Sequence, residues 1–155
     1  MTALVRQLAT VLGWAFLLTS MPILPRVWGL ADQSVQQMIA RADAARVDDQ
    51  PELYINVAER QLKTADQLYK QDQASQAQPL LGDIELYSGK AQHAALASGK
   101  RLKNTEIALR KMAARLRDIQ KGLNFEDQAP VKSVADHLDG LRDALLNRMF
   151  SKESK

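Results

Sequence analysis

A long apolar stripe of helical period runs through the middle of the chain and constrains its fold more than any other feature. Between residues 80 and 123, apolar or small side chains recur at steps of four and three, which places them on one face of an α-helix and excludes a strand. Two consecutive steps of four, at Ala94, Ser98 and Leu102, form a stutter in this heptad pattern. The stripe comprises Leu80, Ile84, Tyr87, Ala91, Ala94, Ser98, Leu102, Thr105, Leu109, Met112, Leu116, Ile119 and Leu123.

The stripe favours one long third helix, bent near Ser98. The alternative is a break at Gly89 or Gly99, because glycine often ends a helix in the left-handed conformation. Ser75 and Gln78 have the spacing of a capping box, which places the start of this helix near residue 75.

Three further stripes predict helices over residues 34–49, 51–71 and 128–149. Ser34 begins the first with a capping box, Pro51 lies in the first turn of the second, and Asp127 or Gln128 caps the last. We therefore expect an all-α protein: an antiparallel helical bundle, or an elongated helical hairpin, of four main helices with a long third helix. Buried positions are expected at Val35, Met38, Ala42, Ala45; Tyr54, Val57, Ala58, Gln61, Leu62, Ala65, Leu68; and Val131, Val134, Leu138, Leu141, Leu145, Met149.

The N-terminal segment has the order of a secretory signal. Arg6 precedes an uncharged apolar run over residues 8–25, and Gly29 and Ala31 give a small-x-small end. We expect residues 1–31 to be a signal peptide, cleaved after Ala31, residues 32–150 to form one helical domain, and residues 151–155 to be a disordered tail. The exported protein would then be periplasmic or extracellular, touching the membrane only through the signal segment. An uncleaved anchor is the alternative.

Charge is distributed unevenly along the chain. Residues 32–85 carry five basic and ten acidic side chains, whereas residues 100–121 carry eight basic and two acidic ones. Lys103, Arg110 and Arg117 are seven residues apart and share one helix face, which makes them candidates for binding an anionic envelope lipid or polymer. The alternative is that basic residues flank the apolar seam and pair with acidic helices. Nucleic acid is not expected as a partner, because no aromatic side chain is interleaved for stacking.

Catalytic and metal sites have little support in the sequence. The two Ser-Gly-Lys triplets, at residues 88–90 and 98–100, lack the glycine spacing and the preceding strand of a phosphate-binding loop. His93 and His137 are the only histidines and cysteine is absent, so we expect no metal, haem or other cofactor. Met38 and His137 are predicted to lie at opposite ends of a bundle. Asp136, Asp139 and Asp143 are expected to form a solvated helix face rather than a calcium site.

Residues 65–91, "ADQLYKQDQASQAQPLLGDIELYSGKA", resemble a tetratricopeptide helix pair, with alanine and tyrosine near the end of one helix and alanine and leucine in the next. The match covers one repeat and lacks the Trp and Leu-Gly positions. This resemblance implies a peptide-binding or scaffolding surface. The chain as a whole, with "SGKRLKNTEIALRKMAARLRDI" at its centre, also resembles exported all-helical bacterial proteins of unassigned activity.

We predict a non-enzymatic interaction or scaffold protein of the bacterial periplasm or cell envelope. An apolar seam on a long third helix exceeds what shorter helices cover, and an uncovered seam is a protein-partner or self-association surface. Its candidate residues are Leu102, Leu109, Met112, Leu116 and Ile119. The alternative prediction is the anion-binding protein described above.

Overall fold

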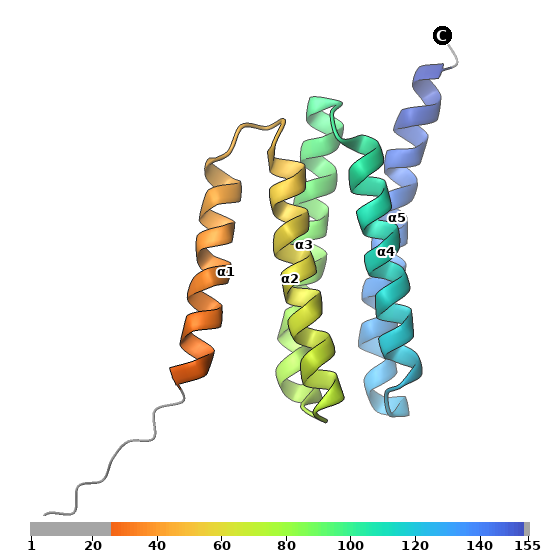
Figure 1. Cartoon of the computed structure of the whole chain (residues 1–155). Helices are drawn as coiled ribbons and strands as arrows, with labels where there is room; N and C mark the ends of the chain where they lie inside the picture. Colours follow the sequence, from red (N-terminus) through yellow and green to blue (C-terminus); the bar gives the residue numbers. More distant parts are fainter. Residues whose placement is uncertain (1–25, 154–155) are drawn as a thin grey trace, which may run out of the picture.

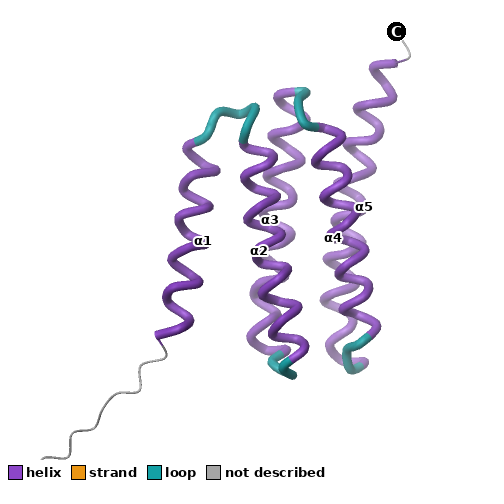
Figure 2. The backbone as a smooth tube through the Cα atoms, viewed as in Figure 1, coloured by secondary structure: helices purple, strands orange, loops and turns teal. Residues whose placement is uncertain are grey.

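The computed structural model describes residues 26–153, with side chains over residues 34–151, and this part of the chain contains five helices and no strand. The prediction of an all-α fold is confirmed. The helices are α1 (Arg26–Ala44), α2 (Gln50–Lys70), α3 (Ala74–Ser98), α4 (Leu102–Lys121) and α5 (Phe125–Glu153). Each helix runs antiparallel to the one before it, and the short loops alternate between the two ends of the molecule (Figure 2).

The molecule consists of two helical hairpins packed side by side, with one helix added at an edge. α2 pairs with α3, α4 pairs with α5, and the hairpins meet mainly through α3 and α5 and through α2 and α4. In Figure 1, α1, α2 and α4 stand nearest the viewer, with α3 behind α2 and α5 behind α4. Among the described helices α1 packs its backbone closely on α2 alone, so the four-helix core is formed by α2 to α5.

The predicted long third helix is two helices, so the expected count of four main helices is wrong. α3 ends at Ser98, Gly99 takes the left-handed conformation at φ 67°, and its N–H donates to the Ala95 carbonyl at 2.9 Å. Arg101 is also left-handed, at φ 56°, and the chain then enters α4. The helix continues through Gly89, so of the two break points that the sequence left open, Gly99 is the one used.

The predicted stripes on either side of this turn form the core. Every buried position predicted for the second helix is buried in α2, including Gln61, whose Nε2 donates to Asp83 Oδ2 on α3 at 2.6 Å. Val131, Val134, Leu138 and Leu145 are buried along α5. The hairpin pairing explains this pattern, because each stripe faces the stripe of its neighbour.

The apolar seam that the sequence offered as a partner surface is covered by the chain itself. Leu102, Leu109, Met112, Leu116 and Ile119 are all buried, because α4 packs on α5 and α2. The seam was expected to be longer than its neighbouring helices because α3 and α4 were predicted to be one helix. Once the chain folds back at Gly99, the hairpins cover each other.

Several helix ends differ from the predicted ones. α1 begins at Arg26, so Ser34 lies inside it and the expected cleavage point after Ala31 falls within the helix; residues 1–25 of the expected signal peptide lie outside the described residues. α3 begins at Ala74 with Gln73 at the cap position, so Ser75 is inside its first turn. α5 begins at Phe125 and continues to Glu153, so residues 151–153 of the expected tail are helical.

Candidate functional site

The arrangement of the first three helices leaves one side of α3 without a neighbouring described helix. α1 and α2 stand side by side and α3 lies behind α2, so no described helix occupies the place behind α1 and beside α3 (Figure 1). A groove of about 440 Å³ lies at this corner. Its lining comes from the start of α2 and the second half of α3: Gln50, Tyr54, Glu85, Leu86, Gly89, Lys90, His93 and Ala94.

One end of the groove is closed by a cluster of two tyrosines and an ion pair. The rings of Tyr54 and Tyr87 stack with their centroids 6.2 Å apart, and Lys90 Nζ lies 5.2 Å and 5.5 Å from the two centroids. Both distances are within the range of a cation–π contact. Asp43, at the end of α1, accepts a hydrogen bond from the Tyr54 hydroxyl at 2.6 Å and lies 3.4 Å from Lys90 Nζ. This cluster therefore ties α1 to both α2 and α3.

The electrostatics of the cluster favour a neutral Tyr54 and an ionised Asp43. Burial, and then the hydrogen bond to Asp43, raise the pKa of Tyr54 to about 12. The hydrogen bond from Tyr54, aided by Lys90, lowers the pKa of Asp43 below its usual 3.8. Near neutral pH the hydroxyl therefore donates to a full carboxylate, which is a strong form of this hydrogen bond.

The outward face of α3 beside the groove carries two glycines, an exposed leucine and a histidine. Gly82, Leu86, Gly89 and His93 follow one another at steps of four, three and four, so they share one face of the helix. The Leu86 side chain is 52% exposed, and a Cβ atom added to Gly82 or Gly89 would meet nothing within 4 Å. Internal packing of the described chain therefore does not require glycine at either position.

The predicted anion-binding residues do not form a free cationic stripe. Lys103 is exposed and has no acidic partner among the described residues. Arg110 Nε, in contrast, lies 3.6 Å from Glu106 Oε1. Arg117 binds Asp139 and also lies 3.5 Å from Asp136 Oδ1 on α5. Two of the three cations thus pair with acidic groups of the same hairpin.

The described residues contain no cluster of three potential metal ligands. His93 and His137 are both exposed. Met38 and His137 lie on α1 and α5, which do not touch, so the structure does not bring them together. The aspartates of the helix face on α5 are engaged with basic neighbours: Asp136 with Lys132 at 2.5 Å, Asp139 with Arg117, and Asp143 with Arg142 at 3.9 Å.

The two Ser-Gly-Lys triplets have unrelated places in the fold. The first lies in the middle of α3, where Ser88 is buried, Gly89 borders the groove and Lys90 covers the two tyrosines. The second spans the end of α3 and the turn into α4, where the Ser98 hydroxyl donates to the Ala94 carbonyl at 2.8 Å. Neither triplet forms a loop that encloses a phosphate.

Neither the groove nor the tyrosine cluster was predicted from the sequence. Both tyrosines were placed in buried stripes, but their contact depends on the register of α2 against α3, which the stripes do not fix. The outward stripe of α3 had a readable signal in the seven-residue spacing of Gly82 and Gly89 around Leu86.

Comparison with known proteins finds no family model that matches the chain, and no curated protein or solved structure with significant similarity to it. The tetratricopeptide-like segment does form an antiparallel helix pair, α2 with α3. None of the described helices is long and apolar enough to span a bilayer.

Proposed function

We propose that this protein is a non-enzymatic interaction module that binds an amphipathic helix of a protein partner in the groove formed by the start of α2 and the second half of α3. One observation carries the proposal: Gly82 and Leu86 are exposed and Gly89 is half-buried on one face of α3, and Leu86 and Gly89 line an open groove. Exposed leucine flanked by two glycines gives an apolar surface to which another backbone can come close.

The dimensions of the surface suit a short helix. From Gly82 to Ala94 the surface follows α3 for about 18 Å at 1.5 Å per residue, which is three to four helical turns. A helix laid along it would present apolar side chains at positions i, i+3 or i+4, and i+7. Glu85, Lys90 and His93 provide polar groups among the residues that line the groove.

This proposal keeps the predicted class of function and changes its surface. The sequence pointed to an apolar seam on residues 102–119, but that seam is covered within the chain. The exposed apolar stripe of α3 is on the opposite side of that helix from the core, and it is available in the folded monomer.

A site-specific photo-crosslinker tests the proposal. Benzoylphenylalanine placed at Leu86 of the full-length protein in its host should form an adduct with a helical segment of one partner. The same group at Ala114, an exposed position on α4, is the control. Gly89→Gln should abolish the adduct by filling the groove, whereas Gly140→Ala, on an exposed part of α5, should leave it unchanged. Equal adducts from positions 86 and 114 would refute the site.

We infer that the module works outside the cytoplasm, since Arg6, the apolar run over residues 8–25 and the Gly29-x-Ala31 end have the order of a signal peptide. N-terminal sequencing of the protein from the host envelope should give Asp32 as the first residue. An intact Met1 on the recovered protein would overturn cleavage after Ala31.

Anion binding through Lys103, Arg110 and Arg117 stays a second prediction with less support, because Arg110 and Arg117 already pair with carboxylates. Binding to vesicles with anionic lipids should fall steeply with salt if it occurs. Lys103→Ala should then weaken it most, since Lys103 is the unpaired member.

A further inference from the structure

The four-helix core consists of two hairpins, α2–α3 and α4–α5. Their only covalent connection is the turn over residues 99–101, and they also pack against each other. Within each hairpin the two helices pack along most of their length, whereas contacts between the hairpins are fewer. One of these inter-hairpin contacts is an ion pair between Asp66 on α2 and Arg115 on α4, at 2.7 Å. Each hairpin thus behaves as a unit whose main outside partner is the other hairpin.

The turn between the hairpins is short and conformationally costly. Of its three residues, Gly99 and Arg101 both have positive φ, and arginine carries a steric penalty there that glycine does not. The spacing of residues across the turn fits a continuous helix: Ala94 and Ser98 before the turn and Leu102 after it are four residues apart. If the three turn residues became helical, α3 and α4 would form a single helix of roughly 70 Å with its apolar face uninterrupted.

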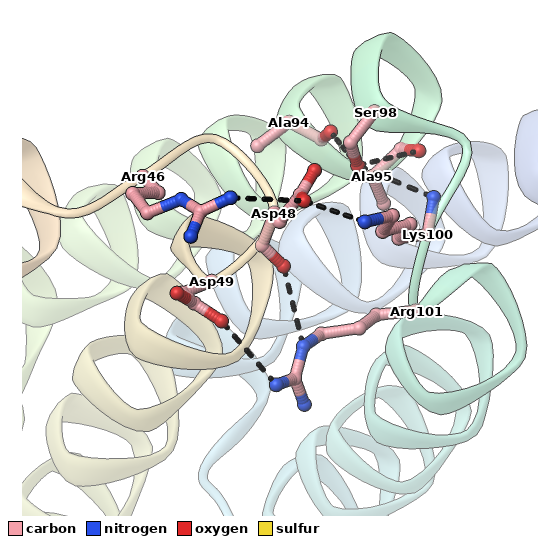
Figure 3. A network of polar contacts seen from close by, with 8 residues as sticks. All are labelled: Arg46, Asp48, Asp49, Ala94, Ala95, Ser98, Lys100 and Arg101. Atoms are coloured by element: carbon pink, nitrogen blue, oxygen red, sulfur yellow. Dashed lines mark hydrogen bonds and ion pairs between the residues drawn. The ribbon is translucent and has the colours of Figure 1, made fainter.

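A set of ion pairs holds the turn in place (Figure 3). Lys100 Nζ donates to Asp48 Oδ2 at 2.6 Å, and Arg101 Nε donates to the Asp48 carbonyl at 3.2 Å. The Arg101 guanidinium also lies 3.5 Å from Asp49 Oδ1 and binds Glu52. We call this set the turn clamp. It joins the α3–α4 turn to the loop before α2, and its partners are exposed enough for salt to screen them.

We propose that the α3–α4 turn is a hinge through which two copies of this chain exchange hairpins. In the exchanged dimer α3 and α4 of each copy form one continuous helix, and the α4–α5 hairpin of one copy packs on the α2–α3 hairpin of the other. Every contact between hairpins is then restored across the two chains, including Asp66 with Arg115. The left-handed strain at Arg101 is released, and the turn clamp is lost. Short, strained hinge loops are the known origin of such exchange.

Variants of the hinge and of its clamp test the proposal. Full-length protein is refolded from urea at a series of concentrations and its mass is measured by light scattering. Gly99→Ala penalises the closed turn and favours helix, so it should lower the dimer dissociation constant at least tenfold. Asp49→Asn with Glu52→Gln removes two clamp partners while leaving the hinge sequence intact, and should shift the equilibrium the same way. For the wild type, added salt should increase the dimer fraction.

A crosslink distinguishes exchange from ordinary docking. Lys63 on α2 and Lys111 on α4 are exposed and line one groove between the hairpins, and the chain has no other cysteine to interfere when both are replaced by cysteine. A bismaleimide should join them within one chain in the monomer and between two chains in the exchanged dimer. Denaturing gels of the separated monomer and dimer fractions show which link has formed.

Matched controls lie away from the hinge. Arg60→Ala and Glu59→Gln, both in the middle of α2, each remove one exposed charge without a described ion-pair partner, and both should leave the dissociation constant unchanged. Monomers at every concentration for both Gly99→Ala and the clamp double variant would overturn the proposal. A dimer whose crosslinks are all within one chain would also overturn it, since it would be docked and not exchanged. If Gly99→Ala does not fold, the clamp double variant still decides between these outcomes. Helix binding at Leu86 is on another face, so failure of the exchange leaves the proposed function standing.

Discussion

Glycine inside an exposed helix lowers stability unless something requires it, and α3 contains two such residues. Gly82 and Gly89 are both helical, and both have open space where a Cβ atom would lie. Helical glycine costs about 1 kcal/mol relative to alanine, so the isolated protein is less stable than this backbone allows. The proposed partner helix would give these glycines a function, since it could approach the α3 backbone closely only where no side chain intervenes.

Gly82→Ala and Gly89→Ala should each raise the free energy of unfolding by about 0.5–1 kcal/mol. For a chain of this size that corresponds to roughly 2–4 °C in Tm per kcal/mol, measurable by circular dichroism. Gly122→Ala is the control: Gly122 lies after the end of α4, so alanine gains no helix propensity there, and its added Cβ would make an ordinary contact with the Ile119 carbonyl oxygen at 3.5 Å; the free energy of unfolding should not rise. A loss of stability in both α3 variants would mean that these positions are packed more tightly than described.

Tyr54 should make the fold sensitive to alkaline pH. Its pKa is raised to about 12 from an ordinary 10.0, so the folded state favours the neutral phenol. The resulting stabilisation is fully present below pH 10 and is lost as the pH rises from 10 towards 12. Urea unfolding at pH 8 to 11 should show a smaller loss for Tyr54→Phe than for the wild type. Identical pH dependence in the two proteins would contradict this assignment.

At the scale of elements, one partly buried ion pair joins α4 to α5. Arg142 Nε donates to Glu106 Oε1 at 2.8 Å, and Glu106 is the one charged side chain that is buried among the described residues. Arg142→Met should cost about 1–2 kcal/mol, because it leaves the Glu106 carboxylate buried with only Arg110 nearby.

The double variant Glu106→Gln/Arg142→Met should recover much of that loss, since it removes the buried charge as well. A double-mutant cycle by urea unfolding measures the coupling. Additive effects of the two single variants would show that the pair contributes nothing as a pair.

α1 should open before the rest of the molecule. Its backbone packs closely on α2 alone among the described helices, and only its last turn reaches α3, through the cluster of Asp43, Tyr54 and Lys90. Hydrogen exchange followed by mass spectrometry should show amides of residues 34–44 exchanging faster than those in the middle of α2 to α5. Asp43→Asn should increase the difference. Equal protection of α1 and α2 would contradict the peripheral packing.

The helix stripes were predictable from the sequence, but the break between α3 and α4 was not. Leu102 and Thr105 are buried whether the chain continues straight or turns at Gly99, because either arrangement buries the same face. What selects the turn is tertiary: the hairpins cover each other, and Arg101 binds the loop before α2 through residues about fifty positions away. Local spacing carries no information about such pairs.

At the scale of the whole molecule, the groove has the same origin as the break. Because the second hairpin folds back onto the first, α1 remains at one edge beside α2, and no described helix lies behind it (Figure 1). The residue types that line the groove were visible in the sequence, but their convergence was not, since Tyr54 and Lys90 meet only through the packing of α2 on α3.

The division into two hairpins also sets an order in time. Contacts within a hairpin join residues close in sequence, so the loop-closure entropy of forming it is small. A chain that emerges from the ribosome N-terminus first completes α2 and α3 while residues 102–153 are still being synthesised. During that interval the first hairpin exposes its apolar face to solvent. In the complete protein α4 and α5 cover this face. The nascent chain is therefore most vulnerable to aggregation before its last fifty residues appear, and most in need of a chaperone then.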